Sequence, residues 1–206
     1  MHISWLGQTC IKLQTKNKKE EDVVILIDPY RPKNGDFPRS FTPQIAVFSH
    51  GSEDAVTLSQ NPFVIDTLGE VEVKDVMFYT LPGEDNNLIT KINCEGMNLL
   101  HLGKTSKKLD GNNIEKIGPV DILFVPVGNA GVYLDPENAA QIVTALEPRM
   151  VIPMAYKCDT DPEVGALDDF VKELGLKPDL ADKKIIIKKK DLPQEETKLI
   201  VLEKNY

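Results

Sequence analysis

The sequence has few cysteines, a single tryptophan and no long apolar run. Its three cysteines, Cys10, Cys94 and Cys158, are an odd number at irregular spacing, which is typical of free thiols in a reducing compartment. The longest apolar runs, such as residues 23–27, are too short to cross a bilayer. The first residues lack the basic and apolar regions of a signal peptide. These absences predict a cytoplasmic protein that is not inserted in a membrane.

Positive charge is also scarce. The formal net charge is −8 at pH 7, and acidic residues lie close to both short basic clusters, Lys16–Lys19 and Lys188–Lys190. Binding to a phosphate backbone usually requires a large basic patch. We therefore expect no nucleic-acid partner. The sequence identifies no other partner, and a homo-oligomer is compatible with it.

The chain also lacks a linker and an internal repeat. No stretch rich in proline, glycine or serine is long enough to separate two domains. With 206 residues and 41% hydrophobic content, the chain can bury one core of moderate size. The sequence predicts a single domain over residues 1–206.

Short β-type runs separated by turn signals fill the first half. We expect strands there at residues 2–6, 10–14, 23–27, 45–48, 63–66, 70–73, 76–80, 88–93 and 97–102, in a largely antiparallel sheet. In the second half, continuous apolar runs indicate buried strands at 122–126 and 150–153.

Helices are predicted to begin at Asp135-Pro136 and at Asp161-Pro162, because aspartate is a good N-cap and proline fits the first turn. Gly175 is expected to end the second helix. Residues 184–187 and 198–202 close the chain as strands. This order predicts an α/β fold with two sheets packed face to face and helices outside.

Polar residues stand out at five strand ends, where active sites are often found. They lie in residues 7–10, at Asp28, and in residues 49–55, 101–105 and 152–156. Singly they are weak signals. His50 and His101 each fit a hydrogen-bonded structural role as well as a ligand role, and Asp28-Pro29 also fits an ordinary turn. The glycine-rich residues 128–131 match neither the dinucleotide fingerprint nor the P-loop.

Taken in order, the segments resemble the metallo-β-lactamase-fold hydrolases, in the branch similar to the ascorbate-6-phosphate lactonases and related small Zn-dependent hydrolases. The matching motifs are Trp5-Leu6-Gly7-Gln8-Thr9-Cys10, Leu26-Ile27-Asp28-Pro29, Gly69-Glu70-Val71-Glu72-Val73-Lys74, Pro126-Val127-Gly128, Asp135-Pro136-Glu137-Asn138-Ala139-Ala140 and Ile152-Pro153-Met154-Ala155-Tyr156. The resemblance implies an αββα sandwich of two packed mixed sheets with flanking helices, and zinc-dependent hydrolysis where the family's site is intact.

The departures from the family pattern fall on its metal ligands. In the loop Ser/Thr-His-x-His-x-Asp-His, His50 and Asp54 match, but Ser52 and Ala55 stand in place of histidines. The loop after residues 76–80, which carries a further histidine in the family, has none. Three other positions also differ: Gln8 for an early histidine, Lys104 for the metal-bridging aspartate, and Ala155 for the final histidine.

A catalytic zinc needs about three protein ligands and an open position for water. By the resemblance, one metal would retain only His50 and the other only Asp54. We therefore expect no metal, no cofactor and no catalytic residue, and predict an inactive protein that works through binding or assembly. The vestigial site comprises Gln8, Asp28, His50, Ser52, Asp54, Ala55, His101, Lys104 and Ala155.

Two alternatives remain open at this stage. One is an active hydrolase, either with Glu53 or Glu84 rebuilding a metal site or with acid–base groups from the vestigial site and Ser52 as nucleophile. The other is a small-molecule sensor that uses the old pocket. The sequence also predicts that the Lys104 ammonium replaces the lost metal charge and pairs with Asp54, because buried carboxylates need a counter-charge.

Overall fold

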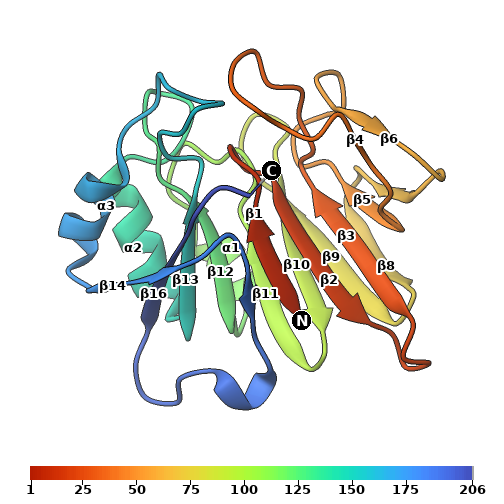
Figure 1. Ribbon diagram of the computed structural model, residues 1–206. Helices are drawn as coiled ribbons and strands as arrows, with labels where there is room; N and C mark the ends of the chain where they lie inside the picture. Colours follow the sequence, from red (N-terminus) through yellow and green to blue (C-terminus); the bar gives the residue numbers. More distant parts are fainter. Residues whose placement is uncertain (206) are drawn as a thin grey trace.

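The computed structural model describes residues 1–205, and two β-sheets pack face to face in it (Figure 1). The six-stranded sheet has the order β15-β1-β2-β3-β5-β7. Its strands are β1 (His2–Trp5), β2 (Ile11–Lys16), β3 (Asp22–Ile27), β5 (Ile45–Val47), β7 (Phe63–Ile65) and β15 (Ile185–Ile186). A separate pair joins β4 (Ser40–Phe41) to β6 (Thr57–Leu58).

The eight-stranded sheet has the order β14-β16-β13-β12-β11-β10-β9-β8. Its strands are β8 (Gly69–Val73), β9 (Val76–Pro82), β10 (Leu88–Cys94), β11 (Met97–His101), β12 (Ile122–Pro126), β13 (Met150–Met154), β14 (Pro178–Ala181) and β16 (Lys198–Leu202). Strands β11, β12, β13, β16 and β14 are parallel to one another, whereas β8 to β11 form an antiparallel meander. The predicted sandwich of two mixed sheets is confirmed.

Alternate residues of the buried strands face two different cores. Ile122 and Phe124 of β12 lie in the core between the sheets, while Leu123 and Val125 face the helices. The helices are α1 (Gly111–Ile117), α2 (Pro136–Leu146) and α3 (Leu167–Leu174), with a short 3-10 turn at Lys189–Asp191. All three α-helices pack on the outer face of the eight-stranded sheet. Within residues 1–205, no helix is both long and apolar enough to cross a membrane.

The helix boundaries test the sequence signals. Helix α2 begins at Pro136 with Asp135 as its N-cap, as predicted, and α3 ends at Gly175 in the left-handed conformation, also as predicted. The start predicted at Asp161-Pro162 is wrong, because the Asp161 N–H donates to the Cys158 carbonyl within a tight turn. Helix α1, capped by the Asp110 side chain, was not predicted.

The strand directions also differ from the expectation for the first half. Strands β3, β5 and β7 are parallel, so this sheet is mixed, with three antiparallel and two parallel pairings. The connections between these strands, residues 28–44 and 48–62, exceed the dozen or so residues that a parallel crossover needs. They contain no helix. Instead, Tyr30, Phe37 and Phe41 pack as a small cluster on the outer face of the six-stranded sheet.

Candidate functional site

The strand-end segments singled out in the sequence meet at one place. The Ala155 N–H donates to the Gln8 carbonyl at 2.9 Å, and the Ser49 N–H donates to Asp28 Oδ1 at 2.6 Å. Gly103 lies so close to Ser49 that an added methyl group would stand 2.6 Å from the Ser49 hydroxyl. The loops after β1, β3, β5, β11 and β13 are therefore neighbours, as the resemblance implies.

Asp28, Ser49 and His50 form a chain of hydrogen bonds. The buried Asp28 carboxylate accepts from the Ser49 hydroxyl at 2.7 Å, and the same hydroxyl lies 2.9 Å from His50 Nδ1. Because the only hydroxyl proton of Ser49 goes to Asp28, His50 Nδ1 must carry a proton and donate to Ser49. In the neutral ring the other nitrogen, Nε2, is then an acceptor, on a side chain that is 34% exposed.

His101 is fully enclosed at the end of β11 and has both ring nitrogens occupied. Nδ1 accepts from the Gly103 N–H at 3.1 Å, so Nε2 carries the proton and donates to the Thr9 carbonyl at 2.8 Å. Burial lowers the pKa of His101, against the raising influence of the Asp28 carboxylate. This neutral ring ties the loops after β1 and β11 together and is closed to a substrate.

Asn87 is a site residue that the sequence did not reveal. Its buried side-chain amide donates to the Leu102 carbonyl at 2.9 Å and to the Thr105 hydroxyl at 3.1 Å, and its oxygen accepts from the Lys104 N–H at 2.8 Å. The three bonds fix the backbone around Lys104. Asn87 lies two residues beyond the loop of residues 81–85, and its role depends on contacts with a distant segment.

Lys104 does not pair with Asp54, so that prediction is wrong. The Lys104 side chain is exposed, and it forms no ion pair with the part of the chain that is described. Its charge instead acts on Asp161. Burial raises the pKa of Asp161, while a hydrogen bond from Tyr133 and the charge of Lys104 act in the lowering direction. Asp161, read from the sequence as a helix cap, is therefore a neighbour of the vestigial site.

The remaining loop residues are open to solvent or engaged elsewhere. Ser52, Glu53 and Asp54 are exposed, and Ala55 is half-buried. His50 contacts the hydroxyl of Ser49, which is buried and already donates to Asp28, so the suggested pairing with Ser52 finds no support in these contacts.

Glu84 turns toward the loop after β11. Its Oε1 accepts from the Ser106 N–H at 2.6 Å and from the Lys107 N–H at 2.7 Å, while Oε2 pairs with the Lys107 ammonium at 3.1 Å. These donors lower the pKa of Glu84 against the opposing effect of burial. The carboxylate is used to hold this loop, which argues against its serving as a metal ligand.

The donor set does not fit the zinc site that the family implies. Three residues that the resemblance places at ligand positions, Ser52, Ala55 and Ala155, bring no imidazole, and Lys104 brings an ammonium where the resemblance implies a carboxylate. Within residues 1–205, no three histidine, cysteine, aspartate or glutamate side chains lie together as a metal-binding group. His50 and Asp54 alone fall short of the roughly three ligands that a catalytic zinc requires.

The sandwich and the order of its strand-end loops define a protein of the metallo-β-lactamase type. A family model described as a beta-lactamase superfamily domain matches residues 2–155, and the chain belongs to this family. The resemblance read from the motifs is thus confirmed.

Relatives and solved structures extend this result. The chain is 26% identical to a UPF0173 metal-dependent hydrolase of Lysinibacillus sphaericus, over 81% of this chain and 91% of that protein. It is 23% identical to the UPF0173 metal-dependent hydrolase MK1542 of Methanopyrus kandleri, over 85% and 94%. A Thermotoga maritima structure assigned to the metallo-beta-lactamase superfamily aligns with a TM-score of 0.81 and 26% identity, covering 98% of both chains.

Proposed function

We propose that this member of the family has lost its metal-dependent hydrolase activity and works through binding or assembly. The observation that carries the proposal is the donor set, in which only His50 and Asp54 match family ligands. Family hydrolysis would depend on a metal that lowers the pKa of bound water to about 7. A cation at position 104 also opposes a dication by charge repulsion.

The hydrogen bonds of the site support the same proposal. Loops that a metal would otherwise cross-link are joined directly, by His101 to Thr9 and by Asn87 to the backbone around Lys104. Since a metal that does not bind the native state cannot stabilise it, adding or removing zinc should change the stability little.

Metal analysis tests the proposal. Protein purified from zinc-supplemented medium should contain far less than one equivalent of zinc, and its thermal midpoint should not move on addition of chelator. Hydrolysis of lactone and phosphodiester test substrates should stay at background. Near-stoichiometric zinc, together with a turnover that disappears in His50→Ala, would overturn the proposal.

A control variant shows that the assay can detect a working site. The combination Ser52→His, Ala55→His, Lys104→Asp and Ala155→His restores four family ligand positions on the same backbone. We expect this variant to take up zinc and to gain a chelator-sensitive thermal midpoint.

One observation favours a second candidate, a hydrolase that needs no metal. The chain Asp28–Ser49–His50 orients the His50 ring and leaves Nε2 as an accessible proton acceptor. A general base of this kind contributes roughly 100- to 10,000-fold to a rate. Turnover by zinc-free protein that is insensitive to chelator and lost in His50→Gln would favour this candidate.

A further inference from the structure

Exposed apolar residues collect at the two outer ends of the sandwich, where β7 and β15 are the edges of the six-stranded sheet and β8 and β14 are the edges of the eight-stranded sheet. Of the seven large hydrophobic residues that are exposed within residues 1–205, six lie on or beside the outermost strands of the sandwich. Phe63, Val64, Leu68 and Met77 are at the β7 and β8 end, and Leu180 and Ile186 are at the β14 and β15 end. Unpaired strand edges with apolar side chains are templates for pairing with another strand.

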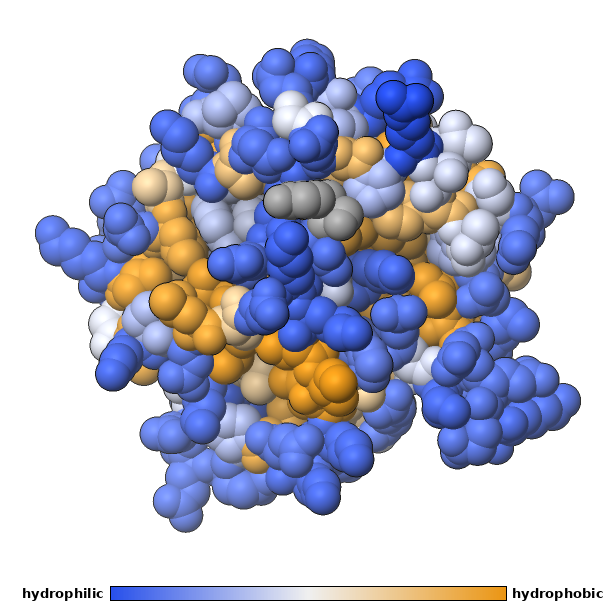
Figure 2. All heavy atoms as spheres, in the orientation of Figure 1, coloured by the Kyte–Doolittle hydropathy of each residue, from blue (hydrophilic) through white to orange (hydrophobic). Residues whose placement is uncertain are grey.

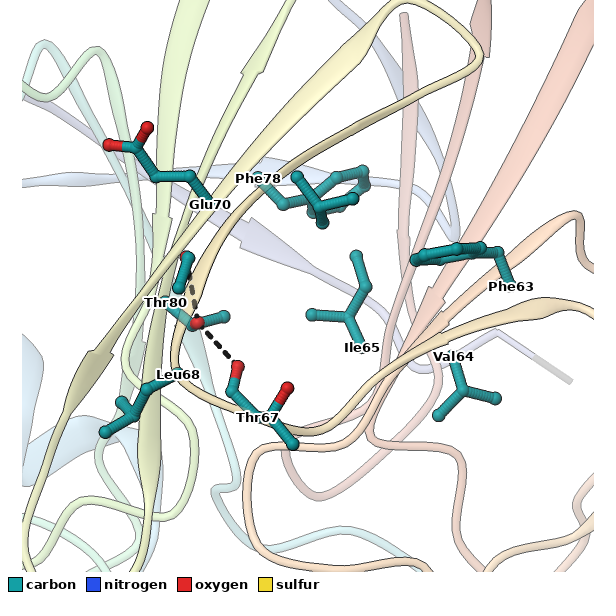
Figure 3. Close-up of a pocket in the computed structure, with 10 residues that line it drawn as sticks. Phe63, Val64, Ile65, Thr67, Leu68, Glu70, Phe78 and Thr80 are labelled. Atoms are coloured by element: carbon teal, nitrogen blue, oxygen red, sulfur yellow. Dashed lines mark hydrogen bonds between the residues drawn. The ribbon is translucent and has the colours of Figure 1, made fainter.

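The β7 edge is acidic. Phe63, Val64 and Ile65 all line a cavity of about 140 Å³, and the Val64 side chain projects from the other side of the strand than Ile65 (Figure 3). Asp66 follows two positions after Val64 and therefore shares its outward face. Asp66 is the acidic residue next to β7, whereas Glu70 and Glu72 lie on the neighbouring strand β8 and Asp75 pairs with Lys18 at 3.5 Å. Asp66 is exposed and forms no ion pair with any residue from 1 to 205.

The β15 edge is basic. Ile185 and Ile187 pack into the core between the sheets, so Lys184, Ile186 and Lys188 face outward by the alternation of a strand. Ile186 is 59% exposed. Residues 177–190 contain six lysines and two aspartates, and Lys184 and Lys188 line a groove that Glu20, Asp22 and Glu95 also line. Figure 2 shows an apolar patch among charged side chains below the centre of the view, over the part of the sandwich where β1 lies in Figure 1.

The strand directions make the two edges complementary. Strand β15 is antiparallel to β1, and β7 has the same direction as β1 because two antiparallel steps and two parallel steps separate them. A second copy placed beside the first in the same orientation therefore presents β7 antiparallel to β15. If Val64 lies opposite Ile186 in this ladder, Asp66 lies opposite Lys184. Directly opposed apolar pairs and opposite charges both stabilise a sheet.

The register that pairs Val64 with Ile186 also brings Leu68 close to an apolar groove of the other copy. Leu68 is 57% exposed, and it would lie near residue 182 of the other copy. A groove of about 490 Å³, lined in part by Ala181, Val201 and Leu202, lies next to that segment.

Other pairings of the edges bring like charges together or leave charges unmatched. Antiparallel pairing of β8 with β8 of a second copy, centred on Val71, would place Glu70 opposite Glu72. Pairing of β7 with itself, centred on Val64, would place Asp66 opposite Pro62. Like charges directly opposed destabilise a sheet, so the head-to-tail arrangement is favoured over these two-fold arrangements.

We propose that copies of this chain associate head to tail, with the acidic β7 edge of one copy pairing antiparallel with the basic β15 edge of the next. The proposal rests on the assembly role proposed above and names its partner, a second copy. A head-to-tail contact produces a closed ring or an open filament.

Charge reversal followed by mixing tests the contact. In sedimentation velocity at low salt, the unmodified chain should associate with increasing concentration, and added salt should weaken the association. Asp66→Lys alone and Lys184→Asp alone should each raise the dissociation constant about tenfold or more, since each replaces an attraction by a repulsion. Mixing the two variants should restore association, because the basic β7 edge of one then meets the acidic β15 edge of the other. Glu72→Lys, an equal charge change on the neighbouring edge strand, should associate like the unmodified chain.

The outcomes separate this proposal from the preceding one. A chain that stays monomeric at all concentrations, or a mixture that remains dissociated, would overturn the contact whatever the zinc content. A zinc-loaded hydrolase that still associates as described would refute the loss of activity and leave the contact standing.

Discussion

Acidification should destabilise the fold through His101. In the folded protein, this ring is buried and neutral, with Nδ1 accepting from the Gly103 N–H at 3.1 Å. A proton on Nδ1 would face that donor, so the folded ring resists protonation, and burial lowers its pKa. In the unfolded chain, a histidine takes up a proton near pH 6.5.

The direction of this pH effect follows from the difference in proton binding between the unfolded and the folded chain. Below about pH 6.5, the unfolded chain binds one more proton at this residue than the folded chain, so acidification favours unfolding. Between about pH 6.5 and the lowered folded pKa, one such group changes the unfolding free energy by at most about 1.4 kcal/mol per pH unit. Above pH 6.5 both states are neutral, and the residue adds no pH dependence.

Urea unfolding between about pH 5.5 and 8 measures this effect. His101→Gln should lower stability at pH 8, because a buried hydrogen-bond network is broken, and it should also flatten the slope below pH 6.5. His2→Gln, at the half-buried start of β1, is the matched control and should keep the slope. If His101→Gln and the unmodified chain have the same slope, His101 does not stay neutral in the folded state and the reasoning fails.

Three further changes test the site by its stability. Asn87→Ala should cost about 2–4 kcal/mol in urea unfolding, because it removes three hydrogen bonds, two of them to the backbone groups of Leu102 and Lys104. Lys104→Met should change stability by less than about 1 kcal/mol, as for an exposed charge without an ion pair, and a loss of several kcal/mol would revive its pairing with a carboxylate. Gly128→Ala should reduce the thermal midpoint severely, since the new methyl group would stand 1.9 Å from the Ala155 oxygen. Gly111→Ala, where a methyl group meets nothing within 4 Å, should be tolerated.

Local signals in the sequence predicted those parts of the fold that depend on short-range chemistry. The apolar run 122–126 became β12 with the same bounds, and Asp135-Pro136 began a helix because capping involves adjacent residues only. At Asp161-Pro162 the same local signal failed. There the aspartate accepts a hydrogen bond from Tyr133, which is far away in the sequence, and the backbone turns back on Cys158.

The site shows the same division between local and distant information. The motif order predicted which loops meet, because members of a fold family share their strand connections. The order did not reveal that Asn87 holds the Lys104 backbone or that Glu84 is used by Ser106 and Lys107. Those roles depend on where side chains of one loop point relative to a second loop. The spacing of residues within either loop does not determine this.

Backbone conformation at the vestigial site explains why its shape persists without the family's ligands. Gln8, Asp28 and Ala155 all have positive φ, at 45°, 48° and 57°, and such conformations cost roughly 1–2 kcal/mol each for residues other than glycine. Backbone hydrogen bonds that involve no ligand side chain hold these conformations. The Asp28 N–H donates to the Val47 carbonyl at 2.8 Å, and the Ala155 N–H donates to the Gln8 carbonyl at 2.9 Å. Since the strained backbone is fixed by the strands and by neighbouring loops, ligand side chains can change at Ala155 or Ser52 without collapse of the site. The same argument explains why restoring the ligand side chains at Ser52, Ala55, Lys104 and Ala155 together should suffice to bring zinc back.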